Sequence, residues 1–565
     1  MATMIFTSFN TSTDSSYTET SEQIRPVSFT GTIVCNARLV ISAILTLTFF
    51  YQFVIRYLIL HHRPPKGLKL IPGPISTIPF LGRLHGINTS HPWLTMHAFS
   101  NQYNKLFRLT AYGEMHIWIG DAKIAKDLIV NRAAKYSSRP EIAAMPGADK
   151  GGRYMALSQF DDHWRIQRRF AHTVIMASHT NSYYGLLEPE AIRLLYSLII
   201  NPRDHYAQTE VFTSRVSTRL CYGSAKTAAR HCRNSSELTL QLSPTNAGPA
   251  THIFPFLMYF PEWLVLSKRA IREQQEREHE LWTGDLARVK SELANGTAAG
   301  HSYARTYLER MQAAKSSSTD IKDFGFDEAE AANALGIICT MAVFTVAGMI
   351  HNFWLMMTVH PAWQTRVREE IDRVVGSDRI VDMADSPNLP VLRAVIRECL
   401  RWKPPAPLGV PHLVTEDDEY NGYYIPKGSV VHVIEQALTR DPELYPDGDS
   451  FRPERWLEKE WPTYQEPLTV YPRLKGASGF GWGKRACDGT EQAQAELVVA
   501  CGSLIWGFEM HPDIDPKTGE QVWPDPFNRS SNVFGGPNPF EFELRVREGR
   551  AERIRNMFEQ IKSQL

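Results

Sequence analysis

Two long apolar runs interrupt the alternation of hydrophobic and polar positions along the chain. The first, Leu39–Leu60, contains a single charged residue, Arg56, near its far end. A helix needs about 20 apolar residues to cross a bilayer, and a long arginine side chain near its end can reach the interface. The run therefore predicts a transmembrane helix, with a buried core helix as the alternative.

The second run, residues 331–359, contains no Asp, Glu, Lys or Arg. Its length would also allow a membrane span, but Asn333, His351 and Asn352 lie within it and charged segments flank it. We therefore expect a helix, roughly 40 Å long at 1.5 Å per residue, that passes through the middle of a soluble core.

The rest of the chain alternates between helical and strand patterns. Apolar residues recur at helical spacing in Pro361–Val374, Leu392–Trp402 and Glu491–Phe508. Residues 412–433 form short β-type runs separated by turn sequences at Asn421-Gly422 and at 426–428. The pattern predicts a mainly α fold with small β-sheets, of the α+β class.

The segments around the first apolar run predict how the chain is arranged at a membrane. Residues 1–30 contain 13 Ser or Thr and few large apolar groups, which favours a disordered tail through residue 38. Asp14, Glu19 and Glu22 argue against a mitochondrial transit peptide. Basic residues at 63, 66 and 69 follow the run, so the positive-inside rule places the tail in the lumen and the remainder in the cytosol.

These patterns divide the chain into five parts. They are a lumenal tail (1–38), a transmembrane anchor (39–60), a Pro/Gly-rich hinge (61–75), a folded domain (76–547) and a charged C-terminal tail (548–565).

Composition narrows the function. The 565 residues include 61 Lys+Arg and 61 Asp+Glu, which is ordinary globular composition and argues against a nucleic-acid partner. The seven cysteines are scattered with no CxxC pair, which indicates reduced thiols rather than disulfides or a zinc site.

Cys487 differs from the other cysteines because of its neighbours. The segment Gly479–Gly489 reads GFGWGKRACDG and directly precedes a predicted helix. Such a loop can point main-chain amides at sulfur, and a helix N-terminus beside it favours the thiolate. The alternative is a glycine-rich turn with a buried cysteine.

Four motifs in this order resemble those of the cytochrome P450 family. The pattern Phe480-x-x-Gly483-x-Arg485-x-Cys487-x-Gly489 is similar to the haem-binding loop of that family. The segments at 164–168 (WRIQR), 398–401 (ECLR) and 451–456 (FRPERW) resemble three further family motifs. The resemblance extends from about residue 72 to 546 and implies a cytochrome P450-like fold behind one N-terminal transmembrane helix.

The resemblance also implies roles for individual residues. Cys487 would be the axial ligand of haem b iron, in a loop shaped by Phe480, Gly483 and Gly489. The haem propionates would be held by Arg485, Arg168 and Trp164, and by His412, for which an ordinary buried histidine is the alternative. A structural charge cluster behind the loop would consist of Glu398, Arg401 and Arg455.

The second apolar run then resembles the family helix that lines the oxygen pocket. Ala342 and Thr345 match the small residue and the threonine of that helix, whereas Phe344 stands where the family has an acid. The threonine helps to deliver protons in the family; the alternative is a helix threonine bonded back to residue 341. Without the acid, water, the substrate or another side chain must complete the proton relay.

Together these observations predict an endoplasmic reticulum monooxygenase with a single-pass anchor and a cytosolic catalytic domain. The family resemblance implies that it takes electrons from NADPH–cytochrome P450 reductase and uses O2 to hydroxylate or epoxidise an apolar small molecule. Residues 254–263, 402–404 and 411–423 resemble fungal microsomal enzymes similar to O-methylsterigmatocystin oxidoreductase, which implies a polyketide or terpenoid intermediate of secondary metabolism.

Several alternatives stay open. Phe344 leaves room for dehydration, rearrangement or oxidative coupling without oxygen insertion, and a haem sensor without turnover is a further alternative. The aromatic run 254–263 is either a membrane-proximal entrance loop or core packing. Arg165, Arg169 and Lys484 form either a docking face for the reductase or an ordinary solvated charge cluster.

Overall fold

The computed structural model describes residues 29–51, 64–76, 78, 82–111, 113–142, 154–180, 183–242, 255–297, 300–316, 325 and 327–562. The chain divides into two compact units, Met1–Ile59 and Leu60–Leu565, which are described separately.

The first unit contains helix α1 (Phe29–Phe50). The helix begins before the expected start at Leu39, so residues 29–38 are helical and do not belong to a disordered tail. This stretch carries one charge, Arg38, and half of its residues are apolar. The predicted tail before residue 29, and residues 52–60 of the predicted anchor, lie outside the described residues.

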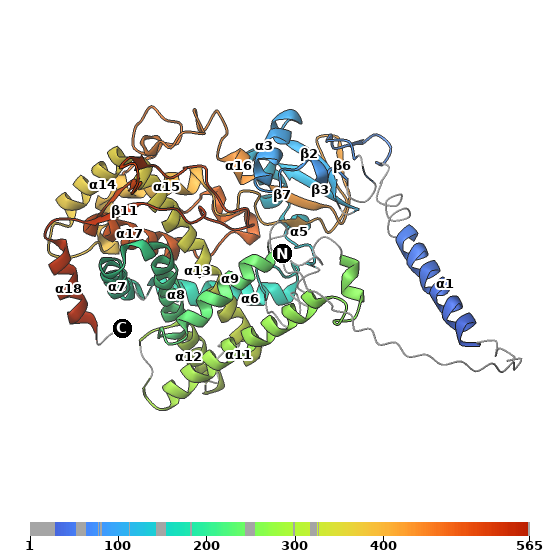
Figure 1. The fold of residues 1–565 in the computed structure, drawn as a ribbon, viewed down its shortest axis with the longest axis horizontal. Helices are drawn as coiled ribbons and strands as arrows, with labels where there is room; N and C mark the ends of the chain where they lie inside the picture. Colours follow the sequence, from blue (N-terminus) through green and yellow to red (C-terminus); the bar gives the residue numbers. More distant parts are fainter. Residues whose placement is uncertain are drawn as a thin grey trace, which may run out of the picture. The chain divides into compact units, whose positions relative to one another are not determined.

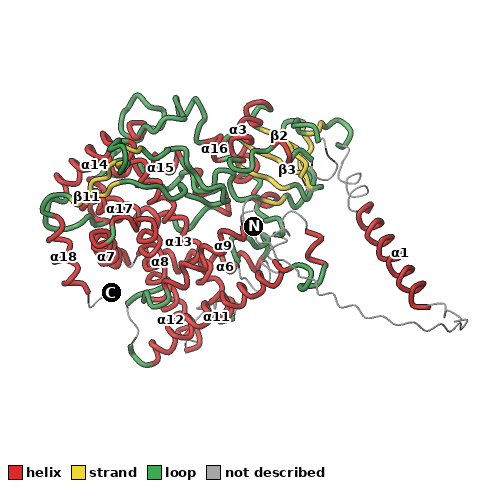
Figure 2. The backbone as a smooth tube through the Cα atoms, in the orientation of Figure 1, coloured by secondary structure: helices red, strands yellow, loops and turns green. Residues whose placement is uncertain are grey.

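In the second unit helices predominate (Figures 1 and 2). The helices are α3 (Pro92–Gln102), α4 (Ala122–Ala125), α5 (Ala133–Tyr136), α6 (Asp162–Thr180), α7 (Leu187–Ile200), α8 (His205–Tyr222), α9 (Ala228–Leu242), α11 (Leu266–Ala294), α12 (Tyr303–Ser316), α13 (Glu328–Val359), α14 (Pro361–Val374), α15 (Pro390–Trp402), α16 (Glu435–Leu438), α17 (Thr490–Gly507) and α18 (Arg550–Ile561).

The strands form small sheets, as the sequence predicts. They are β1 (Lys69–Leu70), β2 (Leu106–Ala111), β3 (Glu114–Ile119), β4 (His412–Leu413), β5 (Asp418–Tyr420), β6 (Tyr423–Ile425), β7 (Val430–Val433), β8 (Phe508–His511), β9 (Asp513–Ile514), β10 (Gln521–Val522) and β11 (Glu543–Val546). One sheet has the order β2-β3-β7-β4 and another the order β1-β6-β5. The predicted turn at Asn421-Gly422 joins β5 to β6, with both residues at positive φ.

Helix α13 forms the centre of the helical layer, which confirms the prediction of a buried core helix. The Asp327 side chain accepts a 2.8 Å hydrogen bond from the Glu330 amide at its start, and the helix ends before Pro361. Helices α8, α9, α11 and α17 pack around it (Figure 1). Within the described residues it is the one helix long and apolar enough to span a membrane, and 67% of its most apolar 18-residue window is buried inside the protein.

The boundaries of the folded domain differ from the prediction at both ends. Part of the expected hinge is built into the fold: β1 pairs with β6, Ile71 is buried, and the Arg108 amide donates to Pro72 O at 2.9 Å. The expected charged C-terminal tail is mostly helix α18, in which Ile554 is buried and Phe558 stacks on Tyr196. Its charged residues masked an apolar stripe at helical spacing.

Candidate active site

The segment around Cys487 forms a tight loop between two short helical turns and helix α17. The Cys487 amide donates a 2.8 Å hydrogen bond to Phe480 O, which closes the loop. Gly483 has φ +58°, and a Cβ atom there would lie 2.8 Å from Ile129 O, so this position requires glycine. Helix α17 begins at Thr490, directly after the loop. The predicted loop and helix are both confirmed.

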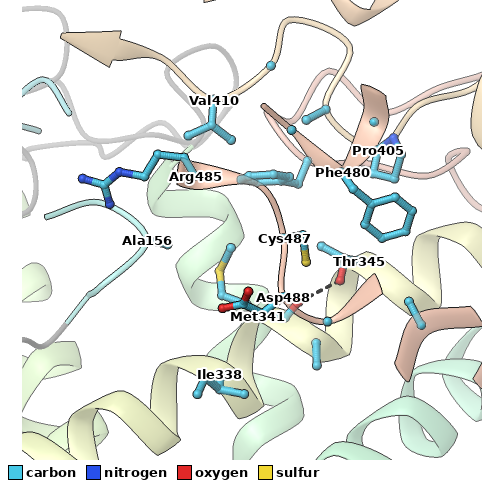
Figure 3. A pocket seen from close by; sticks show the side chains of 18 of the residues that line it. Ala156, Ile338, Met341, Thr345, Pro405, Val410, Phe480, Arg485, Cys487 and Asp488 are labelled. Atoms are coloured by element: carbon cyan, nitrogen blue, oxygen red, sulfur yellow. Dashed lines mark hydrogen bonds between the residues drawn. The ribbon is translucent and has the colours of Figure 1, made fainter. Parts of the chain in front are cut away.

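The loop faces a mostly apolar cavity of about 340 Å³. Cys487 lines one part of the cavity and Thr345 of helix α13 another (Figure 3). The exposed surface of Cys487 belongs to this cavity. The sulfur of Cys487 and the hydroxyl-bearing Thr345, distant in sequence, thus line one cavity.

The surroundings of Cys487 favour the neutral thiol. Desolvation by the surrounding protein raises the pKa of the thiol, and neighbouring Asp488 adds to this, whereas the Gly489 amide and the Arg168 guanidinium lower it. A metal cation bound to the sulfur would displace the proton, because the thiolate is the form that binds metal.

Two arginines, the buried Arg139 and the half-buried Arg485, and the buried His412 line the same cavity. Arg485 donates to Ser137 O, Met155 O and Ser158 O. Arg139 donates to Ala156 O, Val410 O and Pro411 O. The guanidinium of Arg485 lies over the buried indole of Trp164, with its central carbon 4.2 Å from the ring centroid.

The two arginines carry positive charge without an ion pair among the described residues, although the more distant Asp161 offsets part of the charge of Arg485. Among the described residues neither Arg139 nor Arg485 has a carboxylate within 4 Å. Burial, together with Arg139 and Arg168, lowers the pKa of Arg485 to about 8, and burial lowers the pKa of Arg139 to about 9. Burial and the two arginines also lower the pKa of His412, which is therefore neutral. A ligand with carboxylates would relieve this imbalance, as the propionates of haem do, so the residues fit that group.

His412 and Arg168 are less available to propionates than Arg139. The ring of His412 is hydrogen-bonded through Nδ1 to Tyr136 O at 2.7 Å. Arg168 is 2.9 Å from the Asp488 carboxylate and also donates to Ala486 O. The structure therefore places Arg168 as a brace of the cysteine loop.

The predicted oxygen-pocket residues lie on the cavity side of helix α13. Ala342 and Thr345 line the cavity. The Thr345 hydroxyl donates to Met341 O at 2.9 Å, which is the back-bonded arrangement weighed for it as the alternative. Phe344 does not itself line the cavity. Its ring packs against that of Phe534, which does.

Comparisons with known proteins decide the family. The sequence profile described as "Cytochrome P450" matches residues 72–527. The chain belongs to the cytochrome P450 family.

Its relatives include fungal P450 monooxygenases. It is 28% identical over 506 residues to cytochrome P450 monooxygenase virE of Hypocrea virens, covering 88% of this chain and 89% of that protein. Over 505 residues it is 30% identical to cytochrome P450 monooxygenase claR of Ampulloclitocybe clavipes, covering 86% and 88%. A zebra fish cytochrome P450 structure with abiraterone shares the fold, with a TM-score of 0.64 at 21% identity, covering 81% of this chain and all of that one.

This protein is thus a cytochrome P450 monooxygenase, and its family implies a haem with a thiolate ligand. Family membership counts against the alternative of a haem sensor without turnover.

The charge cluster of this P450 is assembled behind the cysteine loop. Arg401 forms a two-pronged ion pair with Glu398, at 2.8 and 2.6 Å, and Arg455 lies 3.5 Å from the same carboxylate. Glu398 also accepts hydrogen bonds from the Trp456 indole and the Arg452 amide. All three predicted members are buried and in contact, which is the arrangement of a structural group.

Three residues of the site were missed by the sequence analysis. Arg139 lies in a Ser-Ser-Arg-Pro segment, where its only signal was a lone charge beside a buried tyrosine. Phe534 and Glu435 carry no local signal, because they reach the cavity through the path of the chain.

Proposed function

We propose that Cys487 binds haem b iron and that this P450 hydroxylates or epoxidises an apolar small molecule with O2. The observation that carries this is the cavity itself, where the sulfur of Cys487 and the hydroxyl-bearing Thr345 meet among apolar side chains. Haem bound there supplies the activation of O2, so that one oxygen atom enters the substrate.

The chain's own residues divide the remaining work. Arg139 and Arg485 would hold the propionates, since a guanidinium fork suits a carboxylate. Ala342 leaves space beside the helix, and Thr345 would hold a water or pass a proton from its hydroxyl. Phe344 brings no carboxyl, so protons must come through that hydroxyl and through water.

The apolar part of the cavity lining supports an apolar substrate. It includes Leu238, Leu242, Ile337, Ile338, Met341, Val346, Met349 and Phe534. Burying such a substrate removes apolar surface from water at about 25 cal/mol per Å². Similarity to fungal monooxygenases supports a polyketide or terpenoid intermediate of secondary metabolism.

We further propose a single-pass anchor in the endoplasmic reticulum membrane with the catalytic unit in the cytosol. Large apolar side chains of α1, including Leu39 and Leu47, are exposed. In the second unit, Tyr259 and Trp263 are 89% and 78% exposed, which argues against core packing for this aromatic run and suits contact with a lipid surface. Electrons would come from NADPH–cytochrome P450 reductase, docked on the exposed Arg165, Arg169 and Lys484.

The function is tested by turnover of candidate pathway intermediates with reductase, NADPH and isotopically labelled O2. Label in the product supports monooxygenation. The second candidate is dehydration, rearrangement or oxidative coupling, favoured by Phe344; product formation without label in any product would support it and overturn oxygen insertion.

A further inference from the structure

One acidic side chain of the cavity lies on the side of the cysteine loop and has no assigned task. Glu435 begins helix α16, directly after strand β7 and Ile434, and its side chain is buried with 3% exposure. Among the described residues it forms no ion pair. Its carboxyl is therefore an uncompensated acid in the wall of the haem site.

The partner of Glu435 is the indole of Trp482, which belongs to the cysteine loop. Trp482 Nε1 donates to Glu435 Oε1 at 3.2 Å. Glu435 Oε2 is buried without a hydrogen-bond partner of normal geometry in the described part of the chain. The carboxyl thus contacts the loop through its hydrogen bond from the Trp482 indole, and the Ser478 hydroxyl is a second hydrogen-bonding neighbour.

Trp482 also contacts the sheet region. It packs against the apolar cluster that includes Ile117, Ile119 and Val431 of the four-stranded sheet. The adjacent Gly483 is pressed against Ile129 O. The loop that presents Cys487 is therefore clamped between this cluster and Glu435, and the indole hydrogen bond is a polar contact of that clamp.

The charge of Glu435 changes near neutral pH. Burial raises its pKa to about 7, while the Ser478 hydroxyl and the Trp482 indole oppose that rise. Burial keeps the titratable groups of the neighbouring elements neutral by lowering or raising their pKa, namely His97, His412, His432 and Tyr445. Other charged side chains that line the cavity are Arg139, Arg168, Arg485 and Asp488, while burial raises the pKa of Glu496 to about 8. Arg397, Arg401 and Glu398 act on Tyr445 together with Glu435.

We propose that Glu435 is a positioning residue of the cysteine loop, which fixes the Trp482 indole and sets the reduction potential of the haem by its charge. The inference rests on the proposed ligation of haem iron by Cys487. A carboxylate in a low-dielectric site stabilises the ferric state over the ferrous state, because the ferric site carries one more positive charge. Protonation of Glu435 removes that stabilisation and raises the potential.

The test is the midpoint reduction potential of the holoenzyme as a function of pH, from about 6 to 8.5. In the wild type the potential should fall as pH rises through about 7. Glu435→Gln keeps an oxygen for the indole but cannot ionise, so it should have a higher potential at alkaline pH and a smaller pH dependence. The exposed Glu460→Gln is the matched control and should behave as the wild type.

A second readout separates positioning from charge. Glu435→Leu and Trp482→Phe both remove the indole hydrogen bond, so both should lose the thiolate-type carbon monoxide spectrum faster than Glu435→Gln does. An unchanged pH dependence in Glu435→Gln, with a normal thiolate-type spectrum, would overturn the inference alone. A wild type without that spectrum would overturn the proposed ligation first, and the inference with it.

Discussion

The ring of Phe344 lies 5.4 Å from the ring of Phe534, inclined at 51° to it. Phe344 occupies the helix position where the family has an acid, and Phe534 lines the cavity from a loop near the C-terminus. With Phe344 in place of the family's acid, this helix position provides a packing contact with the cavity-lining Phe534 and no group that carries a proton.

This contact should be visible in substrate binding. Aromatic pairs contribute about 0.5–1.5 kcal/mol beyond area burial, so Phe344→Leu and Phe534→Leu should each weaken binding. In a double-mutant cycle on the dissociation constant, read from the substrate-induced spectral shift, the two effects should be non-additive by a similar amount. Strictly additive effects would contradict the proposed support of Phe534 by Phe344.

Thr345 should control how efficiently electrons are used. Thr345→Ala removes the hydroxyl that holds water or passes a proton, so more NADPH should be consumed per product and more peroxide released. The ratio of product formed to NADPH consumed should fall several-fold, which is no more than the rate effect of losing a proton-transfer group. Thr345→Ser keeps the hydroxyl and serves as the control. Equal coupling in all three proteins would refute this function for Thr345.

Arg139 should retain the haem. Its replacement by Met removes a charge-assisted hydrogen bond, worth about 1.5–3 kcal/mol, which corresponds to roughly 10- to 100-fold faster haem loss. Transfer of haem to an acceptor globin measures this rate. Arg165→Met is a suitable control, because Arg165 is exposed and paired with Asp162. Equal retention in both variants would argue against propionate binding by Arg139.

In the haem-free protein, Arg485 should make the free energy of unfolding increase as the pH becomes alkaline. Its pKa falls from an ordinary 12.5 to about 8 in the fold. Above about pH 8 the unfolded chain therefore binds more protons than the native one, and the free energy of unfolding should rise with pH from this group.

Chemical denaturation at pH 7.5 and 9.5, compared with Arg485→Met, measures that contribution. The gain should be present in the wild type, absent in the variant and smaller in the haem-loaded enzyme, where propionates restore the charge of Arg485. An identical pH dependence in wild type and variant would show that the guanidinium is not destabilised by burial.

The parts of the site that lie in one continuous segment were predictable from the sequence. The Cys487 loop was predictable because several glycines surround a single cysteine. The helix over residues 331–359 was predictable because the segment carries no charge over more than seven helical turns. Glu398 and Arg401 could be paired because they are three residues apart on one helix.

What could not be predicted depends on contacts between distant segments. Arg139 and Phe534 reach the cavity only after the chain has folded, and neither has a distinctive neighbourhood in sequence. Strand β1 is two residues long and depends on pairing with β6, which is distant in the sequence. The Pro and Gly residues around β1 therefore predicted a hinge instead of a strand. The sequence of helix α18 predicted a charged tail because its buried apolar face is narrow and most of its residues are polar.

The central claim is ligation of haem iron by Cys487, and the carbon monoxide difference spectrum of the reduced holoenzyme tests it most directly. The wild type should give the thiolate-type spectrum, and Cys487→Ser should lose it while keeping wild-type far-ultraviolet circular dichroism. A thiolate-type spectrum that persists in Cys487→Ser, or an imidazole-type spectrum in the wild type, would contradict the account.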